Sequence, residues 1–182
     1  LGGEEYKEMA EGDGHLKTGS VRRLIVGEPI GVFYGYRFDG IFQNEEECKQ
    51  QTSSASPIGV GLRRYKDLNG DGKVDAANDR EILGDANPKF FGGLTNTFAY
   101  KGFELNVFLQ YSYGNKILNY NAMELENPTG GQNAYADMVN RWTPENPSNI
   151  YPKATTNRAL LVSDRFIEDG SYLKLKTLSP VS

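Results

Sequence analysis

Alternating oxygen-bearing side chains form the most chemically suggestive feature of the sequence, in the stretch 65–84 (YKDLNGDGKVDAANDREILG). Asp67, Asn69 and Asp71 stand at alternate positions, and Gly72 follows at the sixth. A hard cation such as Ca²⁺ prefers about six to eight oxygen ligands, and this spacing directs several oxygens toward one centre. Gly72 permits the sharp turn that such a loop needs. The pattern predicts a calcium-binding loop.

The second half of this loop departs from the usual calcium pattern. The carbonyl of Lys73 is expected to be a backbone ligand, Val74 an apolar anchor, and Asp75 a direct or water-mediated ligand. The twelfth position is Asn78 instead of a bidentate Glu, so Asp79 closes the site only if one extra residue is absorbed. An Asx-rich turn without an ion is the alternative, and both stay open. The candidate metal ligands are Asp67, Asn69, Asp71, Lys73, Asp75 and Asp79.

Few other residues suggest a reaction. The sequence has one histidine, His15, and one cysteine, Cys48, and no nucleophile motif. A glycoside hydrolase needs two carboxylates, but any acidic chain offers such pairs by chance. The sequence therefore predicts that the protein is not an enzyme, although its candidate carboxylates are Glu104, Glu124, Glu126 and Asp137.

Composition favours strands and argues against nucleic acid. The chain has 21 glycines and 8 prolines among 182 residues, a turn-rich balance that favours many short strands. Its net charge is −4, and no basic tract is longer than Arg22-Arg23 or Arg63-Arg64. Phosphate binding needs a concentrated positive surface. We expect an all-β fold that does not bind nucleic acid.

A β-hairpin is expected over residues 92–114, GGLTNTFAYKGFELNVFLQYSYG, with Lys101-Gly102 as a two-residue turn. Residues whose numbers sum to 203 then face one another. One face of the hairpin is apolar and the other is mostly polar. The apolar face carries Leu94, Phe98, Tyr100, Phe103, Leu105, Val107, Leu109, Tyr111 and Tyr113, and the other carries Thr95, Thr97, Ala99, Glu104, Asn106, Phe108, Gln110 and Ser112.

The length of the apolar face can be compared with the thickness of a membrane. From Phe103 to Tyr113 it spans ten steps of about 3.3 Å, or roughly 33 Å, which at a tilt of about 40° covers roughly 25 Å of height. Aromatic residues stand at both ends: Tyr100 and Phe103 at the turn, Tyr111 and Tyr113 opposite. Such rings mark membrane interfaces. The residues alone leave a membrane barrel and a soluble sandwich equally open.

The remaining segments are read more coarsely. Residues 1–20 are expected to be a loop, and 30–38 to be a strand with Ile30, Val32, Tyr34, Tyr36 and Phe38 on one face. A second strand is expected over 171–177, with Leu173 and Leu175 on one side. Long loops are expected at 43–61 and 119–163, and the second includes a short helix over 134–142 on which Met138 and Trp142 share a face. Trp142 is expected to anchor a core.

Four blocks of the sequence stand in an order that is specific to one family. They are residues 23–43 (RLIVGEPIGVFYGYRFDGIFQ), residues 65–115, residues 140–147 (NRWTPENP) and residues 166–179 (FIEDGSYLKLKTLS). Through these blocks the chain resembles the C-terminal barrel region of the SusC/RagA family of TonB-dependent outer-membrane transporters from Bacteroidetes. The resemblance covers most of the chain and favours the membrane barrel.

The resemblance implies a fold, a location and partners. Residues 1–182 are expected to be part of a large antiparallel β-barrel in the outer membrane of a Gram-negative bacterium, with long extracellular loops. The plug domain and the remaining strands are not recognisable, and a few strands cannot close a barrel of about 22 strands. The whole transporter is expected to import oligosaccharides or peptides beneath a SusD-like surface lipoprotein, energised by a TonB complex through a missing N-terminal region.

Two departures from the family pattern are visible. The spacing after the DxNxDG core is one residue longer, which weakens the calcium prediction. The ending LSPVS is expected to interrupt the last strand at Pro180, so a truncated gene product or a portion of a longer chain is expected. The alternative function is a soluble, calcium-stabilised β-sandwich that binds ligands at a cell surface.

Overall fold

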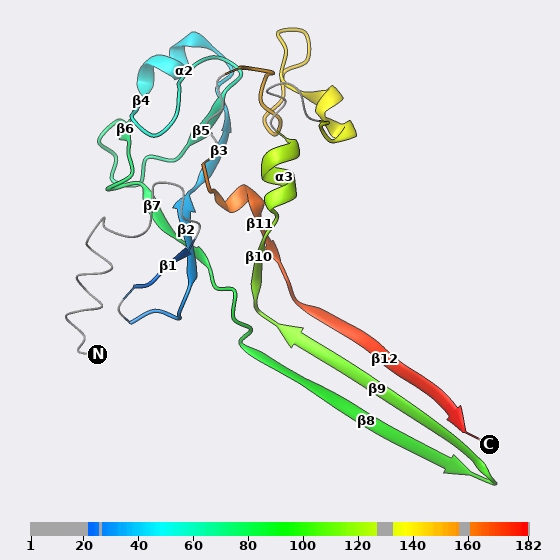
Figure 1. The fold of residues 1–182 in the computed structure, drawn as a ribbon. Coiled ribbons are helices and arrows are strands. Elements are labelled where there is room, and N and C mark those ends of the chain that lie inside the picture. The colour runs from blue at the N-terminus through cyan, green and yellow to red at the C-terminus, as the bar shows by residue number, and fades with distance from the viewer. Residues whose placement is uncertain (1–21, 26, 127–132, 157–160, 182) are drawn as a thin grey trace.

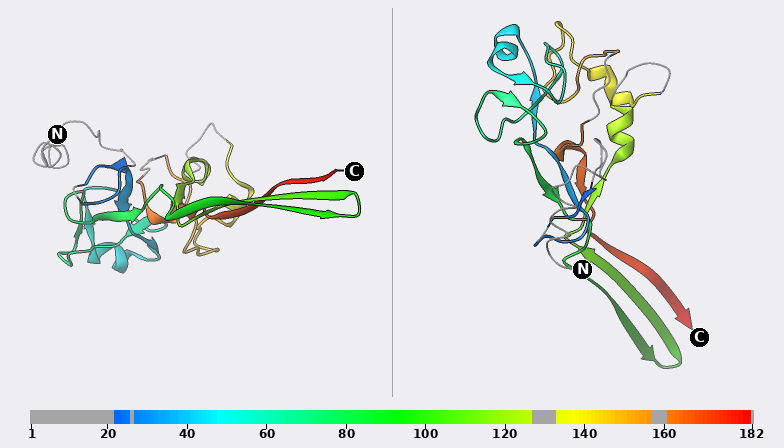
Figure 2. Two further views of the ribbon diagram at one scale, coloured as in Figure 1. Left: turned by 90° about the horizontal axis from the view of Figure 1, so that it is seen from below. Right: turned by 60° about the vertical axis from the view of Figure 1, so that its left-hand side comes forward.

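The computed structural model describes residues 22–25, 27–126, 133–156 and 161–181, and the predicted loop 1–20, with His15, lies outside this range. Figure 1 shows two parts: a head of short strands and helices, and a long three-stranded sheet that projects from it. The long sheet consists of β8 (Phe90–Tyr100), β9 (Phe103–Tyr113) and β12 (Tyr172–Val181). These three strands lie side by side in each view (Figure 2).

The head contains the other elements. Its strands are β1 (Arg22–Arg23), β2 (Val32–Tyr36), β3 (Phe38–Ile41), β4 (Thr52–Ser53), β5 (Arg63–Tyr65), β6 (Lys73–Val74), β7 (Arg80–Gly84), β10 (Lys116–Leu118) and β11 (Ile167–Asp169). Its helices are α2 (Glu45–Gln50), α3 (Tyr120–Leu125) and the 3-10 turns η1 (Ala136–Asn140) and η2 (Asp164–Phe166). None of the helices in the described ranges is long and apolar enough to cross a bilayer.

The predicted hairpin is confirmed in its turn and in its register. All pairs from Phe90↔Tyr113 to Tyr100↔Phe103 have numbers that sum to 203. Lys101 has φ +48° and Gly102 has φ +88°, the left-handed values that a two-residue turn needs to match the twist of its strands. Glycine adopts this conformation without a Cβ clash.

Strand β12 extends farther than the sequence indicated. It pairs antiparallel with β9 from Tyr172↔Ser112 to Val181↔Glu104, so Pro180 does not interrupt it. That prediction was wrong, because the antiparallel pairing with β9 continues through Pro180↔Leu105 to the next residue. A register shift between Leu175 and Thr177 leaves Lys176 unpaired as a bulge.

Small sheets build the head. The strands β1, β2 and β7 form one antiparallel sheet, β3 pairs with β5, and β10 pairs with β11. The pair β4–β6 is parallel, an exception to the expected antiparallel pattern. Closure into a barrel is not seen among the described strands. The fold is therefore mainly antiparallel β-structure with short helices, as expected in outline.

Two apolar clusters hold the head together. One joins Ala122 and Met123 of α3 to Val162 and Phe166. The other joins Tyr36, Tyr65 and Val74, which brings β2, β5 and β6 into contact. Val74 is 1% exposed, so its predicted role as the anchor of the 65–84 loop is confirmed.

The strand predicted over residues 30–38 divides into β2 and β3. Gly31 turns the chain at φ +79° and leaves Ile30 80% exposed, outside the strand. At the other end, Tyr36 N donates to Val162 O at 2.9 Å and Phe38 N to Asp164 Oδ1 at 2.8 Å. The chain thus leaves its pairing with β7 and begins a new one with β5. Both sides of β2 are buried, because Phe33 and Gly35 on the second face are covered as well as Val32 and Tyr36 on the first.

The helix predicted over 134–142 is shorter than expected. The 3-10 turn η1 ends before Arg141, whose backbone is extended, so Met138 and Trp142 do not share a helical face. The backbone N–H of Trp142 instead donates to Tyr151 O at 3.0 Å, and its indole Nε1 donates to Gln43 Oε1 at 3.0 Å. The half-buried indole packs against Gly61 and lies outside the two apolar clusters described above, so Trp142 connects loops instead of anchoring a core.

Candidate functional site

One face of the long sheet is apolar across all three strands. The bulge at Lys176 matters here, because Leu173 and Leu175 lie beside Tyr111 and Leu109, whereas after the bulge Leu178 lies beside Val107. Without the extra residue, Leu178 would lie on the opposite face. We call this surface the apolar face; besides Gly92 and one polar side chain, Asn96 opposite Val107, it comprises Phe90, Leu94, Phe98, Tyr100, Phe103, Leu105, Val107, Leu109, Tyr111, Tyr113, Leu173, Leu175, Leu178 and Pro180.

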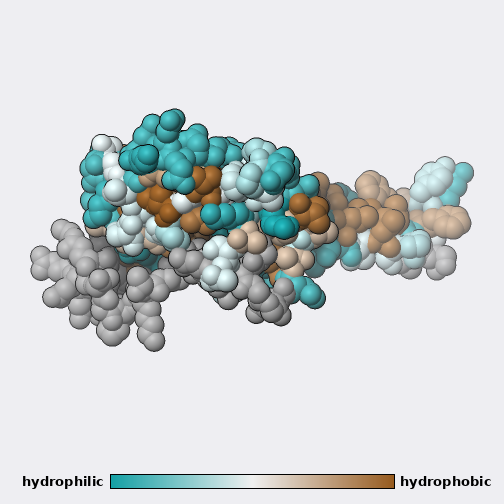
Figure 3. All heavy atoms as spheres, turned by 90° about the horizontal axis from the view of Figure 1, so that it is seen from above, coloured by the Kyte–Doolittle hydropathy of each residue, from teal (hydrophilic) through white to brown (hydrophobic). Residues whose placement is uncertain are grey.

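These side chains are open to the surroundings. Leu94 is 53% exposed, Phe98 59% and Leu173 72%. Fully burying one such side chain contributes about 1.5–3 kcal/mol, and soluble monomers rarely leave a patch of more than a few hundred Å² uncovered. In Figure 3 the hydrophobic colour runs along the projecting sheet, whereas hydrophilic colour covers most of the described head. The apolar face is suited to a non-aqueous surrounding.

Aromatic rings mark both ends of the apolar face. At the head end, Phe90 stacks on Tyr113 with ring centroids 4.9 Å apart and meets Tyr111 edge-on at 6.1 Å. At the turn end, Tyr100 and Phe103 face each other. Phe90 was not part of the expected hairpin, although its number also sums to 203 with Tyr113. The spacing of Leu175 and Leu178, three residues instead of two, was the sequence signal for the bulge.

The opposite face of the long sheet is mostly polar. Thr97 donates a hydrogen bond to Asn106 Oδ1, and Asn106 Nδ2 donates to Glu104 Oε1 at 3.1 Å. Glu104, considered as a catalytic carboxylate, is thus one acceptor in a row of polar side chains. Phe91 is an exception, at 76% exposed. We call this surface the polar face; it comprises Phe91, Gly93, Thr95, Thr97, Ala99, Glu104, Asn106, Phe108, Gln110, Ser112, Tyr172, Lys174, Thr177 and Ser179.

The edges of the long sheet have unused backbone groups. In the described sheet, β8 and β12 each have one neighbour, β9. Unpaired N–H and C=O groups are costly in hydrocarbon, so a spanning sheet must continue until it closes. An apolar face, aromatic ends, a polar reverse face and open edges together describe a section of a membrane barrel.

The Asp/Asn loop is held by its own backbone. Asp67 accepts from Gly70 N at 2.7 Å and Gly72 N at 2.6 Å, and Asp71 accepts from Lys73 N at 2.8 Å. Asn69 Nδ2 donates to Asp71 Oδ2 at 3.0 Å. These are the local bonds of Asx turns. Each of these two carboxylates therefore already accepts a hydrogen bond from within the loop.

Asp75 and Asp79 fix the second half of the loop. Hydrogen bonds from the backbone of Asn78, then from Lys73 Nζ, hold the pKa of Asp75 below its ordinary value. Asp79 is 0% exposed, and its two oxygens accept from Leu68 N at 2.8 Å and Asp75 N at 2.7 Å. Asp79 thus ties the start of the loop to its end.

The six predicted metal ligands all lie in the 67–79 loop. Among the described residues, no group of three or more carboxylate, imidazole or thiol side chains is placed to hold a metal ion. The structure supports the Asx-turn alternative directly, through the hydrogen bonds above. Calcium binding by Asp67, Asn69, Asp71, Lys73, Asp75 and Asp79 stays a prediction.

A buried charged cluster in the head was not foreseen. The carboxylate of Glu126, another catalytic candidate, accepts from Arg165 Nη2 at 2.7 Å and Nε at 2.9 Å. Arg63 donates to the backbone oxygen of Glu126 at 3.1 Å, and both guanidinium groups lie over the ring of Phe166. Burial lowers the pKa of Arg63. The paired charge of Glu126 makes it a structural acceptor that ties α3 to β5 and η2.

Nearby, burial raises the pKa of Tyr65 to about 12, so this phenol stays protonated in the core. Asp137 accepts from the Tyr151 hydroxyl at 3.5 Å. Three of the four carboxylates considered for catalysis thus belong to different local networks: Glu104 in the sheet, Glu126 with Arg165 and Asp137 beside Tyr151. Their surroundings give no reason to assign any of them an acid–base role.

Sequence comparisons identify relatives of known class. The chain is 38% identical over 166 residues to TonB-dependent receptor P3 of Formosa agariphila, and 33% identical over 180 residues to TonB-dependent receptor P26 of the same organism. The matches cover 91% and 98% of this chain but 16% and 18% of those receptors. The chain is homologous to part of the TonB-dependent receptors. No protein-family model matches it.

Solved structures agree with this homology. The structure of the RagAB peptide transporter superposes with a TM-score of 0.63 at 21% identity, covering 90% of this chain and 17% of the other. The 'open-open' state of the RagAB peptide importer gives the same TM-score over 88% of this chain. At this identity the likeness concerns the fold alone. The chain spans about a sixth to a fifth of the relatives' length.

The homology indicates where the protein is located in the cell. TonB-dependent receptors are outer-membrane proteins of Gram-negative bacteria and are not enzymes, so these two predictions are confirmed. The resemblance to RagA-like receptors is confirmed as well. The apolar face of the long sheet now has a physical explanation, since the outer membrane supplies the hydrocarbon that it needs.

We expect Asp79→Ala to loosen the 67–79 loop by about 2–4 kcal/mol, because two partly buried amides lose their acceptor. Asp67→Ala should cost less than about 1.5 kcal/mol, since water replaces its bonds to exposed amides. Native-state hydrogen exchange of the loop measures both. Equal effects of the two substitutions would contradict the role given to Asp79.

Calcium binding is tested by the same exchange measurement with calcium and with a chelator. If the loop binds the ion, saturating calcium slows exchange over residues 67–75, and calcium at about 100 times Kd stabilises the loop by about 2.7 kcal/mol. Asp71→Ala should remove this effect, and Glu46→Ala, an exposed carboxylate on α2, should leave it unchanged. Identical exchange with calcium and chelator would reject the prediction.

Proposed function

We propose that this chain supplies three barrel strands and an extracellular head to a TonB-dependent importer of oligosaccharide or peptide nutrients. The observation that carries the proposal is the continuous apolar face of β8, β9 and β12, which ends in aromatic rings at both sides. Homology to TonB-dependent receptors supports the same function. The apolar face contacts lipid and the polar face lines the lumen.

The orientation of the sheet follows from its two ends. Outer-membrane barrels have short periplasmic turns and longer extracellular loops. The Lys101-Gly102 turn is two residues long, whereas the head joins the strands at the other end. The turn is therefore periplasmic and the head extracellular. Loops between rigid elements carry most binding residues, so the segments 43–61 and 119–163 of the head are proposed to contact substrate and partner.

The partners follow from the relatives. The importer is proposed to work with a SusD-like surface lipoprotein above the head and with a TonB complex through a part of the protein outside these residues. The matched structures are described as a RagAB peptide importer, which supports a peptide substrate and a second component. An oligosaccharide remains the other proposed substrate class, and the polar face offers hydroxyl and amide groups suited to either.

The soluble calcium-stabilised sandwich is less consistent with the structure. A sandwich covers the inner face of each sheet with a second sheet about 10 Å away. In the described ranges, no second sheet lies over the apolar face, and its large side chains are exposed. The homology to outer-membrane receptors also favours the barrel.

Adjacent substitutions on β8 test the lipid contact. Leu94→Lys places a charge on the apolar face near the middle of the strand and should cost about 2–4 kcal/mol in a membrane, whereas Thr95→Lys on the polar face should cost about 1 kcal/mol or less. Folded barrel is measured as the heat-modifiable form of the whole protein in outer membranes. Equal yields of the two variants would contradict the lipid contact, because both positions are exposed to water in a soluble fold.

Import is tested by removing the gene that encodes the protein. Growth and uptake on peptides or on oligosaccharides as the sole carbon source should fail for one of these classes, and the intact gene should restore it. Full restoration by Thr95→Lys but not by Leu94→Lys would connect uptake to the barrel. Unimpaired uptake of both classes in the deletion strain would contradict the import function.

A further inference from the structure

Aromatic side chains gather on the polar face at the end of the long sheet that joins the head (Figure 1). Phe91 on β8 and Tyr172 on β12 both lie opposite Ser112 of β9, and they are 76% and 46% exposed. Phe108 lies on the same face of β9, four residues before Ser112. Aromatic rings among a few polar groups are typical of binding sites for small molecules.

Gly93 gives the ring of Phe108 its position. A Cβ atom at Gly93 would lie 2.6 Å from Cε2 and 3.1 Å from Cζ of this ring, so a larger residue fits only if the ring moves. The ring therefore extends over the neighbouring strand β8, toward Phe91, which precedes Gly93 by two residues on the same face. Phe91 and Phe108 together form an apolar platform on this side of the polar face.

A polar row crosses the sheet at the level of Gly93. Lys174 on β12 lies opposite Gln110 on β9, and Gln110 lies opposite Gly93 on β8. Neighbouring strands are about 4.8 Å apart, so the backbones of Lys174 and Gly93 are separated by roughly 10 Å. Within the described ranges, neither the Lys174 ammonium nor the Gln110 side-chain amide has a hydrogen-bond or ion-pair partner. Both groups are available to a ligand on the platform.

The bulge in β12 adds a second cation. Lys176 follows Leu175 of the apolar face, and because successive side chains alternate, Lys176 projects to the polar side. Bulges re-aim side chains in this way and are frequent beside functional sites. Lys176 is exposed and has no ion-pair partner among the described residues. The acidic side chain of the described polar face, Glu104, is six residues from Gln110 on β9, or roughly 20 Å away. The head end of the polar face is therefore positively charged.

We propose that this patch binds an anionic oligosaccharide, whose sugars carry carboxylate or sulfate groups. The apolar C–H face of a sugar ring lies on Phe91 and Phe108, and the Gln110 amide bonds to its hydroxyl groups. Lys174 and Lys176 hold the acidic groups through charge-assisted hydrogen bonds. The inference rests on the proposed function, because it names the substrate class of the importer and takes the polar face to line the lumen. At the proposed extracellular end, the patch meets an entering nutrient early.

An acidic peptide fits this patch less well. The central strand β9 is paired on both sides, so its backbone groups are already used by β8 and β12. A peptide that binds by strand addition needs an open edge, and in a barrel the edges of β8 and β12 pair with further strands. Sugar hydroxyl groups, in contrast, need only side-chain partners such as the Gln110 amide.

The experiment uses the whole protein that contains this chain, in a zwitterionic detergent, and measures binding by calorimetry at about 0.1 M salt. The acidic probes are tetragalacturonic acid, an alginate tetramer and a sulfated carrageenan tetramer. Fully methyl-esterified tetragalacturonic acid is a neutral probe with the same rings, and tetraglutamate is the peptide probe. At least one acidic oligosaccharide should bind saturably, about tenfold or more tightly than the neutral probe and tetraglutamate.

Substitutions locate the site. Lys174→Gln and Lys176→Gln should each weaken binding of the acidic tetramer about tenfold, because each removes one charge-assisted hydrogen bond. Lys174→Arg keeps the charge and should retain binding within about threefold. Lys101→Gln makes the same change of charge in the turn at the other end of the sheet, beyond the range of screened electrostatics, and should change binding less than about twofold. Phe91→Leu, at an exposed position, should weaken binding about fivefold.

The outcomes separate this inference from the import function. Saturable binding of an acidic tetramer, weakened by Lys174→Gln but not by Lys101→Gln, would support the patch. The absence of saturable binding by all three acidic tetramers would overturn it. Equal binding by Lys174→Gln, Lys176→Gln and the wild type, or tighter binding of tetraglutamate, would overturn it as well.

The remaining part of the protein is a competing partner for the two lysines. If they pair with another segment of the same protein, Lys174→Gln should lower the melting temperature more than Lys101→Gln does, and the acidic tetramers should not bind. That result would also overturn the proposal. Intact binding together with unimpaired uptake in the deletion strain would reject only the import function.

Discussion

The pairing register of the long sheet is the constraint on which the rest of the structure depends. Side chains alternate between the two faces of a strand, so a slip of one residue would exchange the side chains of the apolar face and the polar face. The Lys101-Gly102 turn sets the register of β8 on β9, and the bulge at Lys176 sets that of β12. Together these two irregular points keep apolar side chains on one face over the whole sheet.

The head is stabilised by different interactions from those of the long sheet. It lacks a single large core and instead joins short strands through two small apolar clusters and a partly buried pair of charges, Glu126 and Arg165. Where the chain is polar, carboxylates that accept hydrogen bonds from backbone amides stabilise the loops in place of apolar packing. Asp79 does this in the 67–79 loop. A mostly polar part of the chain can be held together in this way.

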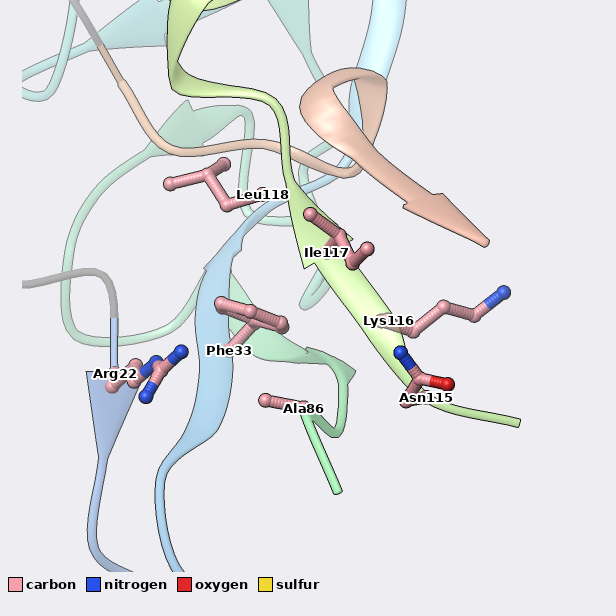
Figure 4. A pocket seen from close by; sticks show the side chains of 7 residues that line it. All are labelled: Arg22, Phe33, Ala86, Asn115, Lys116, Ile117 and Leu118. Carbon is pink, nitrogen blue, oxygen red and sulfur yellow. The ribbon is translucent and has the colours of Figure 1, made fainter. Parts of the chain in front are cut away.

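The two parts are connected by the segments beside β7, β8, β9 and β10, where Phe33, Ile117 and Leu118 contribute to the wall of a cavity of about 550 Å³ (Figure 4). The same region holds the aromatic end of the apolar face, formed by Phe90, Tyr111 and Tyr113.

The sequence by itself determined the hairpin, its turn, its register and its two faces, because these depend on local alternation and on two turn residues. It also determined homology, through blocks in a fixed order. Only the tertiary structure decided the division of β2 from β3, the continuation of β12 through Pro180 and the short η1, because these depend on distant partners such as Asp164, β9 and Tyr151. The sequence also did not predict that Asp79 links the two ends of the 67–79 loop. The spacing of residues indicates which side chains could be ligands, but it does not show which backbone amides donate hydrogen bonds to them.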